Sequence, residues 1–210
     1  MIRSSFFIDG FNFYHALKAL GAPHLKWVDL AKLMARQISP KTEKIEAIYY
    51  FSAYAYWWPD RKARHEEYVK AINEVGVSVV MGHFKKKTRG CNSCGAHWIG
   101  HEEKETHVNI ALCLLNEAYK DSYDRAYVVS RDSDLKPAIT MVRSLFPAKE
   151  VIAVAPPNLG HSVDLLQVST GKRKISRKQI EQCLFGAVVA DAGGNVVATR
   201  PSQYDPPSTP

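Results

Sequence analysis

Long hydrophobic runs are missing from this 210-residue sequence. No stretch reaches the roughly 18 apolar residues of a membrane-spanning helix, and residues 1–7 lack the apolar length of a signal peptide. We therefore expect no membrane insertion and no secretion, with the cytoplasm as the default location. Cysteines are also few: there are four, and in a chain without a secretion signal they do not predict disulfides. No segment is repeated, which argues against a repeat architecture.

Acidic residues are fewer than basic ones. The sequence has 28 Lys+Arg against 21 Asp+Glu and a formal net charge of +7, which favours a polyanionic partner such as nucleic acid. A hydrophobic content of 46% over this length is enough for one globular domain with a sizeable core. We expect that domain over residues 1–170, and a basic extension with a Pro/Gly-rich tail over residues 171–210.

Apolar runs alternate with amphipathic segments along the chain. Short β-branched or aromatic runs predict strands at residues 6–9, 45–51, 77–81, 126–130 and 151–155. Helical spacing of apolar residues predicts helices at 27–38, 60–75 and 107–119, and a further helix with Pro137 in its first turn. This alternation predicts an α/β fold built from βαβ units, with a parallel sheet of about five strands.

Acidic side chains follow two of the predicted strands. Asp9 ends the first strand, and Asp132 and Asp134 come just after the fourth. Open α/β sheets place their sites beyond the carboxyl ends of the strands, and Mg²⁺ or Mn²⁺ is usually held there by one or two carboxylates. The pattern predicts a hard-metal site, to which Asn12 adds an oxygen-bearing side chain. The alternative is that Asp132 and Asp134 only cap the helix that begins near Leu135.

Three segments together resemble a known family. They are residues 7–12 (FIDGFN), 103–111 (EKETHVNIA) and 128–135 (VVSRDSDL). In this order they resemble the NYN domain, in the LabA-like branch of the PIN-like nucleases. The resemblance implies a PIN-like (Rossmannoid) three-layer α/β/α fold and a metal-dependent nuclease, specifically an endoribonuclease that cleaves RNA. It also implies that Asp9 and Asp132 bind metal and act in catalysis, with Asp134 as a further ligand and Asn12 in support.

Two positions depart from the family pattern, which has Asp at position 107 and Gly at position 131. His107 suits Mn²⁺ better than Mg²⁺, so the chain is either a nuclease with an altered metal preference or an RNA-binding or regulatory adaptor that has lost turnover. Glu103, four residues earlier on the same predicted helix face, is a second candidate ligand. A phosphohydrolase acting on small phosphate esters is a third alternative.

A CxxC motif, Cys91 and Cys94, falls in a predicted loop over residues 85–101. Two thiolates at this spacing are half of a structural Zn²⁺ site. Closing it requires both His97 and His101, or a second CxxC from a partner subunit in a homodimer. The alternative is two free thiols.

Several side chains suit contact with single-stranded RNA. Adjacent cations on the predicted loop suit phosphates, aromatic rings suit unpaired bases, and residues near a helix N-terminus suit a phosphate. These groups are, in turn, Lys85, Lys86, Lys87 and Arg89; Trp57 and Trp58; and Ser130, Arg131 and Ser133. For the aromatic residues, packing under the neighbouring loop is the alternative.

Overall fold

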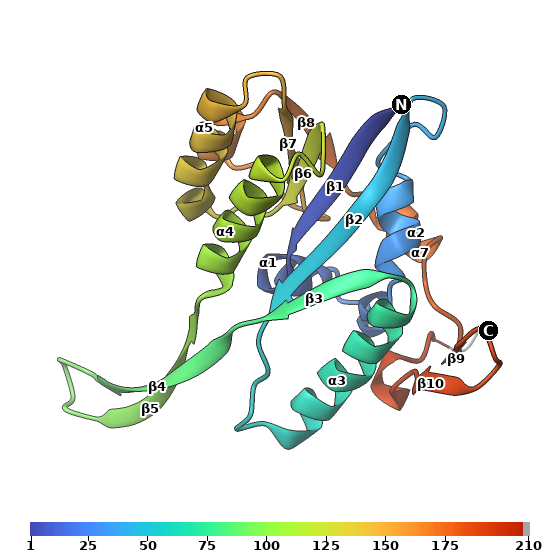
Figure 1. Ribbon diagram of the computed structural model, residues 1–210. Helices are drawn as coiled ribbons and strands as arrows, with labels where there is room; N and C mark the ends of the chain where they lie inside the picture. The colour runs from blue at the N-terminus through green and yellow to red at the C-terminus, as the bar shows by residue number, and fades with distance from the viewer. Residues whose placement is uncertain (208–210) are drawn as a thin grey trace.

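Six parallel strands form the central sheet of the computed structural model, which describes residues 1–207 (Figure 1). In chain order they are β1 (Ile2–Asp9), β2 (Glu43–Ser52), β3 (Val77–Met81), β6 (Arg125–Val129), β7 (Glu150–Ala155) and β8 (Gly171–Lys174). Across the sheet their order is β3-β2-β1-β6-β7-β8. The five predicted strands are all present. The sixth, β8, is an edge strand of glycine and cations without the apolar pattern that identified the others.

Helices cover both faces of the sheet. One face packs against α1 (Gly10–Ala19), α2 (Leu30–Ala35), α3 (Pro59–Glu74) and α7 (Arg177–Glu181), and the other against α4 (Thr106–Tyr119), α5 (Lys136–Leu145) and α6 (Val163–Val168). Short 3-10 helices, η1 (Pro23–Lys26), η2 (Ser133–Leu135) and η3 (Ser202–Tyr204), lie in the connections. In β1, Phe6 and Ile8 face one layer and Phe7 the other, so the strand is apolar throughout. The predicted three-layer α/β/α fold is confirmed.

The helix predicted over residues 27–38 is the shorter α2. The side chain of Asp29 accepts a hydrogen bond from the backbone N–H of Lys32 and caps the helix at Leu30. Trp27 and Val28, counted as helical from their apolar spacing, are instead fully buried in the segment before the cap. Core packing, and not helical periodicity, explains their apolar character.

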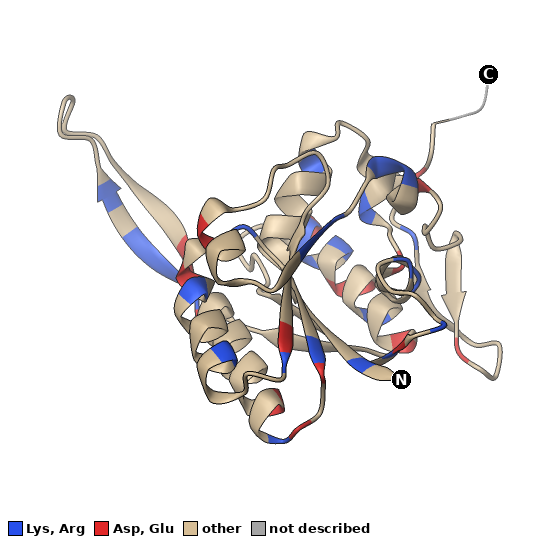
Figure 2. Ribbon diagram, turned by 90° about the horizontal axis from the view of Figure 1, so that it is seen from above, with Lys and Arg blue, Asp and Glu red and all other residues tan. Residues whose placement is uncertain are grey.

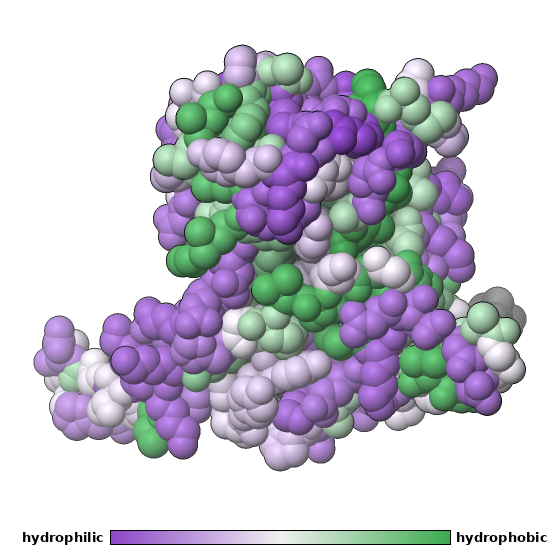
Figure 3. Space-filling view, in the orientation of Figure 1, coloured by the Kyte–Doolittle hydropathy of each residue, from purple (hydrophilic) through white to green (hydrophobic). Residues whose placement is uncertain are grey.

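The predicted loop over residues 85–101 is in fact a β-hairpin. Strands β4 (His83–Gly90) and β5 (His97–Lys104) pair antiparallel and project from the body of the protein (Figure 1). Most of their side chains are exposed or half-exposed, and the surface of the hairpin is mainly hydrophilic (Figure 3). Because both faces of most of the hairpin meet solvent, its sequence lacks the alternation that marks a half-buried strand.

Residues 171–207 belong to the same fold and not to a separate extension. Strand β8 completes the sheet, and Ile175 and Ile180 are fully buried in the core. A second hairpin, β9 (Val188–Ala190) and β10 (Val196–Thr199), reaches α3, where the Thr199 N–H donates to Glu67 Oε2 at 3.1 Å. The tail predicted from composition is therefore ordered up to residue 207, and residues 208–210 lie outside the described part. Within residues 1–207, no helix is long and apolar enough to cross a membrane.

Candidate metal centre

The connections of the sheet change direction between β1 and β6. From β1 the chain continues to β2 and β3 on one side, and from β6 to β7 and β8 on the other. Ligands of open α/β sheets bind at such a switch point, beyond the carboxyl ends of the strands. Ile8 pairs with Val129 in register, so the next residues, Asp9 and Ser130, are neighbours at this edge.

Asp9 ends β1 and caps α1. Its Oδ1 accepts the backbone N–H of Asn12 at 3.0 Å, and its Oδ2 accepts the Asn12 side-chain amide at 2.8 Å. Gly10 permits this geometry, since a Cβ there would lie 2.6 Å from the carbonyl oxygen of Phe51 on β2. Because α1 lies close to the sheet at Gly10, the hydrogen bonds from Asn12 hold the Asp9 carboxylate in one orientation.

Ser130 connects the two acidic strand ends. Its hydroxyl donates to Asp9 Oδ2 at 2.8 Å and accepts the backbone N–H of Asp132 at 3.1 Å. The residue is only 3% exposed, so the expected phosphate contact of Ser130 is wrong, whereas Arg131 and Ser133 are exposed and remain predictions for phosphate binding. The bridging role was missed, although the position of Ser130 directly after a buried strand was an available signal.

His107 lies between the two acids at the start of α4. Its Nε2 is 3.2 Å from Asp132 Oδ2 and 3.6 Å from Asp9 Oδ2. The contact with Asp9, opposed by burial and reinforced by the charge of Asp132, raises the pKa of His107 to about 9. The direct contact with Asp9 is the largest cause of this rise, whereas the charge of the nearer Asp132 acts more strongly than the charge of Asp9. At neutral pH the imidazole is therefore a cation in the metal-free protein.

Asp9 itself is ionised although it is fully buried. Burial acts to raise the pKa of Asp9, but the contact with His107 and the hydrogen bonds from Asn12 and Ser130 outweigh it and lower that pKa below its ordinary value. No Lys or Arg of residues 1–207 forms an ion pair with Asp9. Within the described residues, His107 is the one cationic side chain that pairs with Asp9.

Three side chains offer metal-ligand atoms within 4.8 Å of one another: those of His107, Asp132 and Asp134. Asp132 serves two purposes, because its Oδ1 accepts the Asp134 N–H at 2.9 Å and caps η2 while its Oδ2 faces His107. Capping and cluster formation are therefore not alternatives. One imidazole nitrogen and two carboxylates fit a divalent ion and suit Mn²⁺ better than Mg²⁺.

Glu103 lies in β5 and not on the helix that carries His107. The helix begins only at Thr106, since Glu105 has a left-handed backbone conformation with φ of 77°. Glu103 Oε1 accepts the backbone N–H of Thr106 at 2.9 Å and so satisfies a donor of the first turn of α4. The expectation that Glu103 and His107 share a helix face is wrong, and Glu103 is outside the ligand group.

The predicted cluster of cations is divided between the two faces of the hairpin. Lys86 lies on the face that Phe84 turns toward the body, whereas Lys85, Lys87 and Arg89 lie on the opposite face, which we call the outer basic face. Figure 2 shows the Lys and Arg positions along the projecting strand. Glu102 pairs with Lys87 at 3.3 Å and offsets part of this charge.

The two tryptophans differ in their surroundings. Trp57 is half-buried and stacks on the ring of His101, with ring centroids 3.6 Å apart. Trp58 is 47% exposed, and the guanidinium of Arg61 lies 3.8 Å over its ring. Trp58 and Arg61 form an exposed cation–π pair, and Trp57 forms part of a packed aromatic cluster.

Cys91 and Cys94 lie at the tip of the hairpin. Hydrogen bonds from the backbone and the thiol of Cys94, and from the backbone of Ser93, lower the pKa of Cys91. A lowered thiol pKa favours the thiolate form, which is the form that binds metal. This turn therefore presents two suitable zinc ligands.

Neither predicted histidine joins these two cysteines. His101 is at the base of the hairpin, paired in register with Lys86, so the prediction of His101 as a zinc ligand is wrong. His97 pairs with Gly90, which places its side chain on the face opposite to that of the next residue, Cys91. In residues 1–207 no third ligand approaches the cysteine pair. Zinc binding and a homodimer that would complete the site remain predictions.

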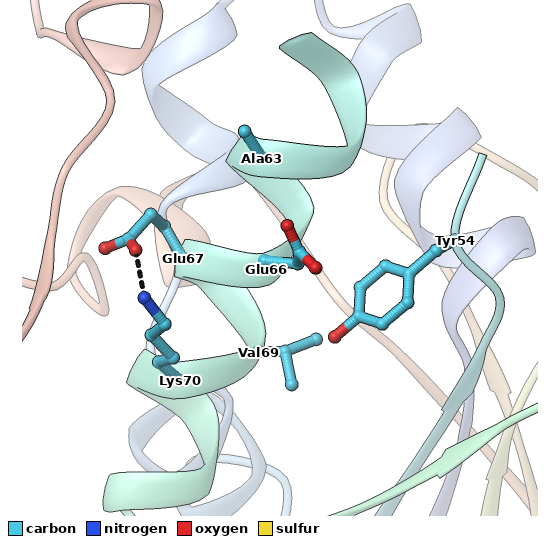
Figure 4. A pocket seen from close by; sticks show the side chains of 6 residues that line it. All are labelled: Tyr54, Ala63, Glu66, Glu67, Val69 and Lys70. Carbon is cyan, nitrogen blue, oxygen red and sulfur yellow. Dashed lines mark hydrogen bonds and ion pairs between the residues drawn. The ribbon is translucent and has the colours of Figure 1, made fainter. Parts of the chain in front are cut away.

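A hollow of about 460 Å³ lies against α3 (Figure 4). Its lining residues are Tyr54, Ala63, Glu66, Glu67, Val69 and Lys70. Glu67 and Lys70 pair with each other across its wall, and no residue of the metal centre takes part. The hollow therefore lacks the converging donors found at the switch point.

Comparisons with known proteins bear on both the fold and the family. The family model of the NYN domain matches residues 3–169. The 6-hydroxy-3-succinoylpyridine 3-monooxygenase HspA of Pseudomonas putida is 23% identical over 227 residues, covering 90% of this chain and 72% of that protein. The crystal structure of VPA0982, a protein of unknown function from Vibrio parahaemolyticus, is 18% identical with a TM-score of 0.55, covering 88% of this chain and 96% of that one. The latter similarity supports the α/β fold alone. The family match over most of the chain shows that it belongs to the NYN domain family, a family of PIN-like nuclease domains.

Proposed function

We propose that this chain is a divalent-metal-dependent ribonuclease that cleaves single-stranded RNA internally. The observation that carries the proposal is the group of ligand atoms of His107, Asp132 and Asp134 within 4.8 Å of one another. This group lies beside the buried, ionised Asp9 at the switch point of the sheet, where a phosphate of the substrate has access from solvent. Membership of a PIN-like nuclease family supports the same chemistry.

A bound Mn²⁺ or Mg²⁺ would lower the pKa of a coordinated water and stabilise the charge that develops on the scissile phosphate. His107, Asp132 and Asp134 are the residues that would hold this ion. Asp9 keeps them in place, since it contacts His107 directly and holds the backbone of Asp132 through Ser130. Asn12 fixes Asp9 in turn. The proposed metal ligands are therefore held by Ser130, which links Asp132 to Asp9, and by the buried Asp9 itself.

The hairpin gives the RNA a path to this centre. Its strand β5 ends at Lys104, three residues before His107, so contacts along the hairpin lie on the same continuous segment as the ligand group. The outer basic face offers Lys85 and Arg89 without an ion-pair partner among residues 1–207, and such cations bind phosphates. The exposed Arg131 follows β6 closely, and its backbone N–H donates to Asn12 Oδ1 at 3.3 Å. Cations both on the hairpin and beside the centre favour an extended polyanion over a small phosphate ester.

The direct test is cleavage of a labelled single-stranded RNA by the purified protein with Mn²⁺. We expect cleavage that EDTA abolishes and that Asp132→Asn reduces by several orders of magnitude. Asp60→Asn, which removes an exposed acid on α3, is the matched control and should cleave like the parent. Cleavage of equal rate by Asp132→Asn would refute the assignment of this centre.

The position of His107 favours a second candidate, an RNA-binding adaptor without turnover. The ring nitrogen lies between two carboxylates, in the space that a metal would share, and so neutralises part of the cluster itself. Under this alternative the parent binds RNA without cleaving it, and His107→Asp, which restores the acid usual in the family, introduces Mn²⁺-dependent cleavage. Mn²⁺-dependent cleavage by the parent protein would exclude the adaptor.

The similarity to HspA favours a third candidate, hydroxylation of a pyridine ring, because that is the reaction in its printed name. The test is oxygen consumption with 6-hydroxy-3-succinoylpyridine and a reduced nicotinamide as electron donor. Oxygen uptake that depends on the pyridine, together with no RNA cleavage, would replace the ribonuclease proposal. We expect RNA cleavage and no such uptake.

A further inference from the structure

A pocket of about 330 Å³ lies at the base of the hairpin. Its lining residues come from the segment after β2, from β4 and from β5, and they are Tyr56, Trp57, Phe84, Lys86 and His101. Four of the five carry aromatic rings and the fifth is a cation. This volume is near the lower limit of ordinary ligand pockets, which suits one planar group and not several.

We infer that this pocket binds one unpaired nucleobase of the RNA, an inference that rests on the proposed ribonuclease function and names a subsite for its substrate. Aromatic side chains stack on bases of any sequence, and a neighbouring cation neutralises the phosphate attached to the bound nucleotide. The pocket offers both: aromatic rings from the segment after β2 and from the hairpin, and the cation Lys86 from β4.

The rings of the pocket are held in place before any ligand arrives. Trp57 and His101 stack with centroids 3.6 Å apart and an interplanar angle of 8°, and Phe84 meets Trp57 edge-on at 4.7 Å and 85°. Such packing fixes the orientation of the rings, so a base that binds there loses little to reordering of the protein. Tyr56, in contrast, is 63% exposed and meets only Tyr54 edge-on, with centroids 6.2 Å apart, and Lys62 at 5.7 Å among the described residues, so its ring can move aside to admit a ligand.

Two polar groups of the pocket, on Lys86 and His101, lack a partner among the described residues. Lys86 forms no ion pair with any residue between 1 and 207, unlike Lys87 beside it. The Nε2 atom of His101 is buried without a hydrogen-bond partner, which is costly for a polar atom shielded from water. A base edge entering as Tyr56 moves aside would supply that partner.

The pocket connects to the metal centre through a single aromatic contact. Phe84, which packs on Trp57, also meets Phe11 edge-on with centroids 5.4 Å apart. Phe11 is in the first turn of α1, next to Asn12, which holds Asp9. An RNA strand with one base in the pocket would therefore run past Phe84 toward the acidic cluster. The nucleotide bound there would lie close to the scissile phosphate along the RNA.

The test uses the full chain in EDTA, so that binding is measured without cleavage. A short single-stranded RNA is compared with versions that carry one abasic residue at each position in turn. We expect the loss of one particular base to weaken binding roughly 5- to 150-fold, the value of one stacked base, and losses elsewhere to have smaller effects.

Two matched pairs of variants assign this penalty to the pocket. Tyr56→Ala should shrink the abasic penalty, while Tyr119→Ala, which removes a similarly exposed tyrosine of α4, should leave it unchanged. Lys86→Ala should weaken binding more than Lys85→Ala, its neighbour on the outer face.

RNA that binds with no position sensitive to base removal would overturn the base subsite and leave the ribonuclease proposal standing. A penalty that persists in both Tyr56→Ala and Lys86→Ala would place the base elsewhere and also overturn it. Absence of RNA binding would overturn both proposals. Base-sensitive binding without cleavage on addition of Mn²⁺ would support the subsite and contradict the ribonuclease.

Discussion

Replacing Ser130 by Ala removes the bridge between the two acidic strand ends. The Ser130 hydroxyl donates to Asp9 Oδ2 at 2.8 Å and accepts the Asp132 N–H at 3.1 Å, and it is 3% exposed. A hydrogen bond to a charged group contributes about 1.5 to 3 kcal/mol, and the unpaired N–H adds a further cost. We therefore expect Ser130→Ala to lower the free energy of unfolding by about 2 to 4 kcal/mol at neutral pH.

Urea unfolding of the metal-free protein measures this change, and Ser133→Ala is the matched control. Ser133 is three residues further on, exposed, and its side chain makes no hydrogen bond with residues 1–207. The lowered pKa of Asp9 contributes stability at pH values above the ordinary pKa of Asp, and this stability is lost as the pH falls through the lowered pKa. The difference in the free energy of unfolding between the parent and Ser130→Ala should therefore become smaller in acid. Equal stability of the parent and Ser130→Ala, or an equal loss in Ser133→Ala, would refute the bridging role.

Three further predictions concern other parts of the chain. Replacing the outer basic face by alanines should reduce the slope of log affinity for single-stranded RNA against log salt by roughly 0.7 for each lost phosphate contact, and an unchanged slope would assign the phosphates to other residues. Burial lowers the pKa of His65 to about 4, so this group should lower the free energy of unfolding of the parent by at most about 2 kcal/mol as the pH falls from 7 to 5. Urea unfolding should show this loss in the parent and not in His65→Phe. Metal analysis and light scattering should find one zinc ion shared by two chains through Cys91 and Cys94, whereas one zinc in each monomer, or none, would contradict the shared site.

The strand ends that carry the metal centre could be predicted from the sequence because each is a buried parallel strand. Such strands are apolar on both faces, so the runs before Asp9 and Ser130 stand out, and the switch point then brings their ends together. The hairpin could not be predicted in this way, since solvent meets both of its faces and no apolar period remains. Only the structure shows that one face of the hairpin packs on the body of the protein, through Phe84 and His101 against Trp57.

The start of α4 shows a different limit. A regular helix through residues 103–107 would place Glu103 beside His107, as the sequence suggested. The left-handed conformation of Glu105, which non-glycine residues seldom adopt, ends the hairpin and delays the helix to Thr106. No residue preference in this segment signals that conformation. Whether Glu103 lies beside His107 on the helix therefore depends on the backbone conformation of Glu105 alone.

We propose above all that His107, Asp132 and Asp134 together hold a divalent ion at the switch point of the sheet. Anomalous diffraction from a crystal soaked in Mn²⁺ tests it most directly. We expect a manganese peak within about 2.0 to 2.6 Å of ligand atoms from these three side chains, and no such peak in Asp132→Asn. A peak at any other position, or none at this edge in the parent protein, would contradict it.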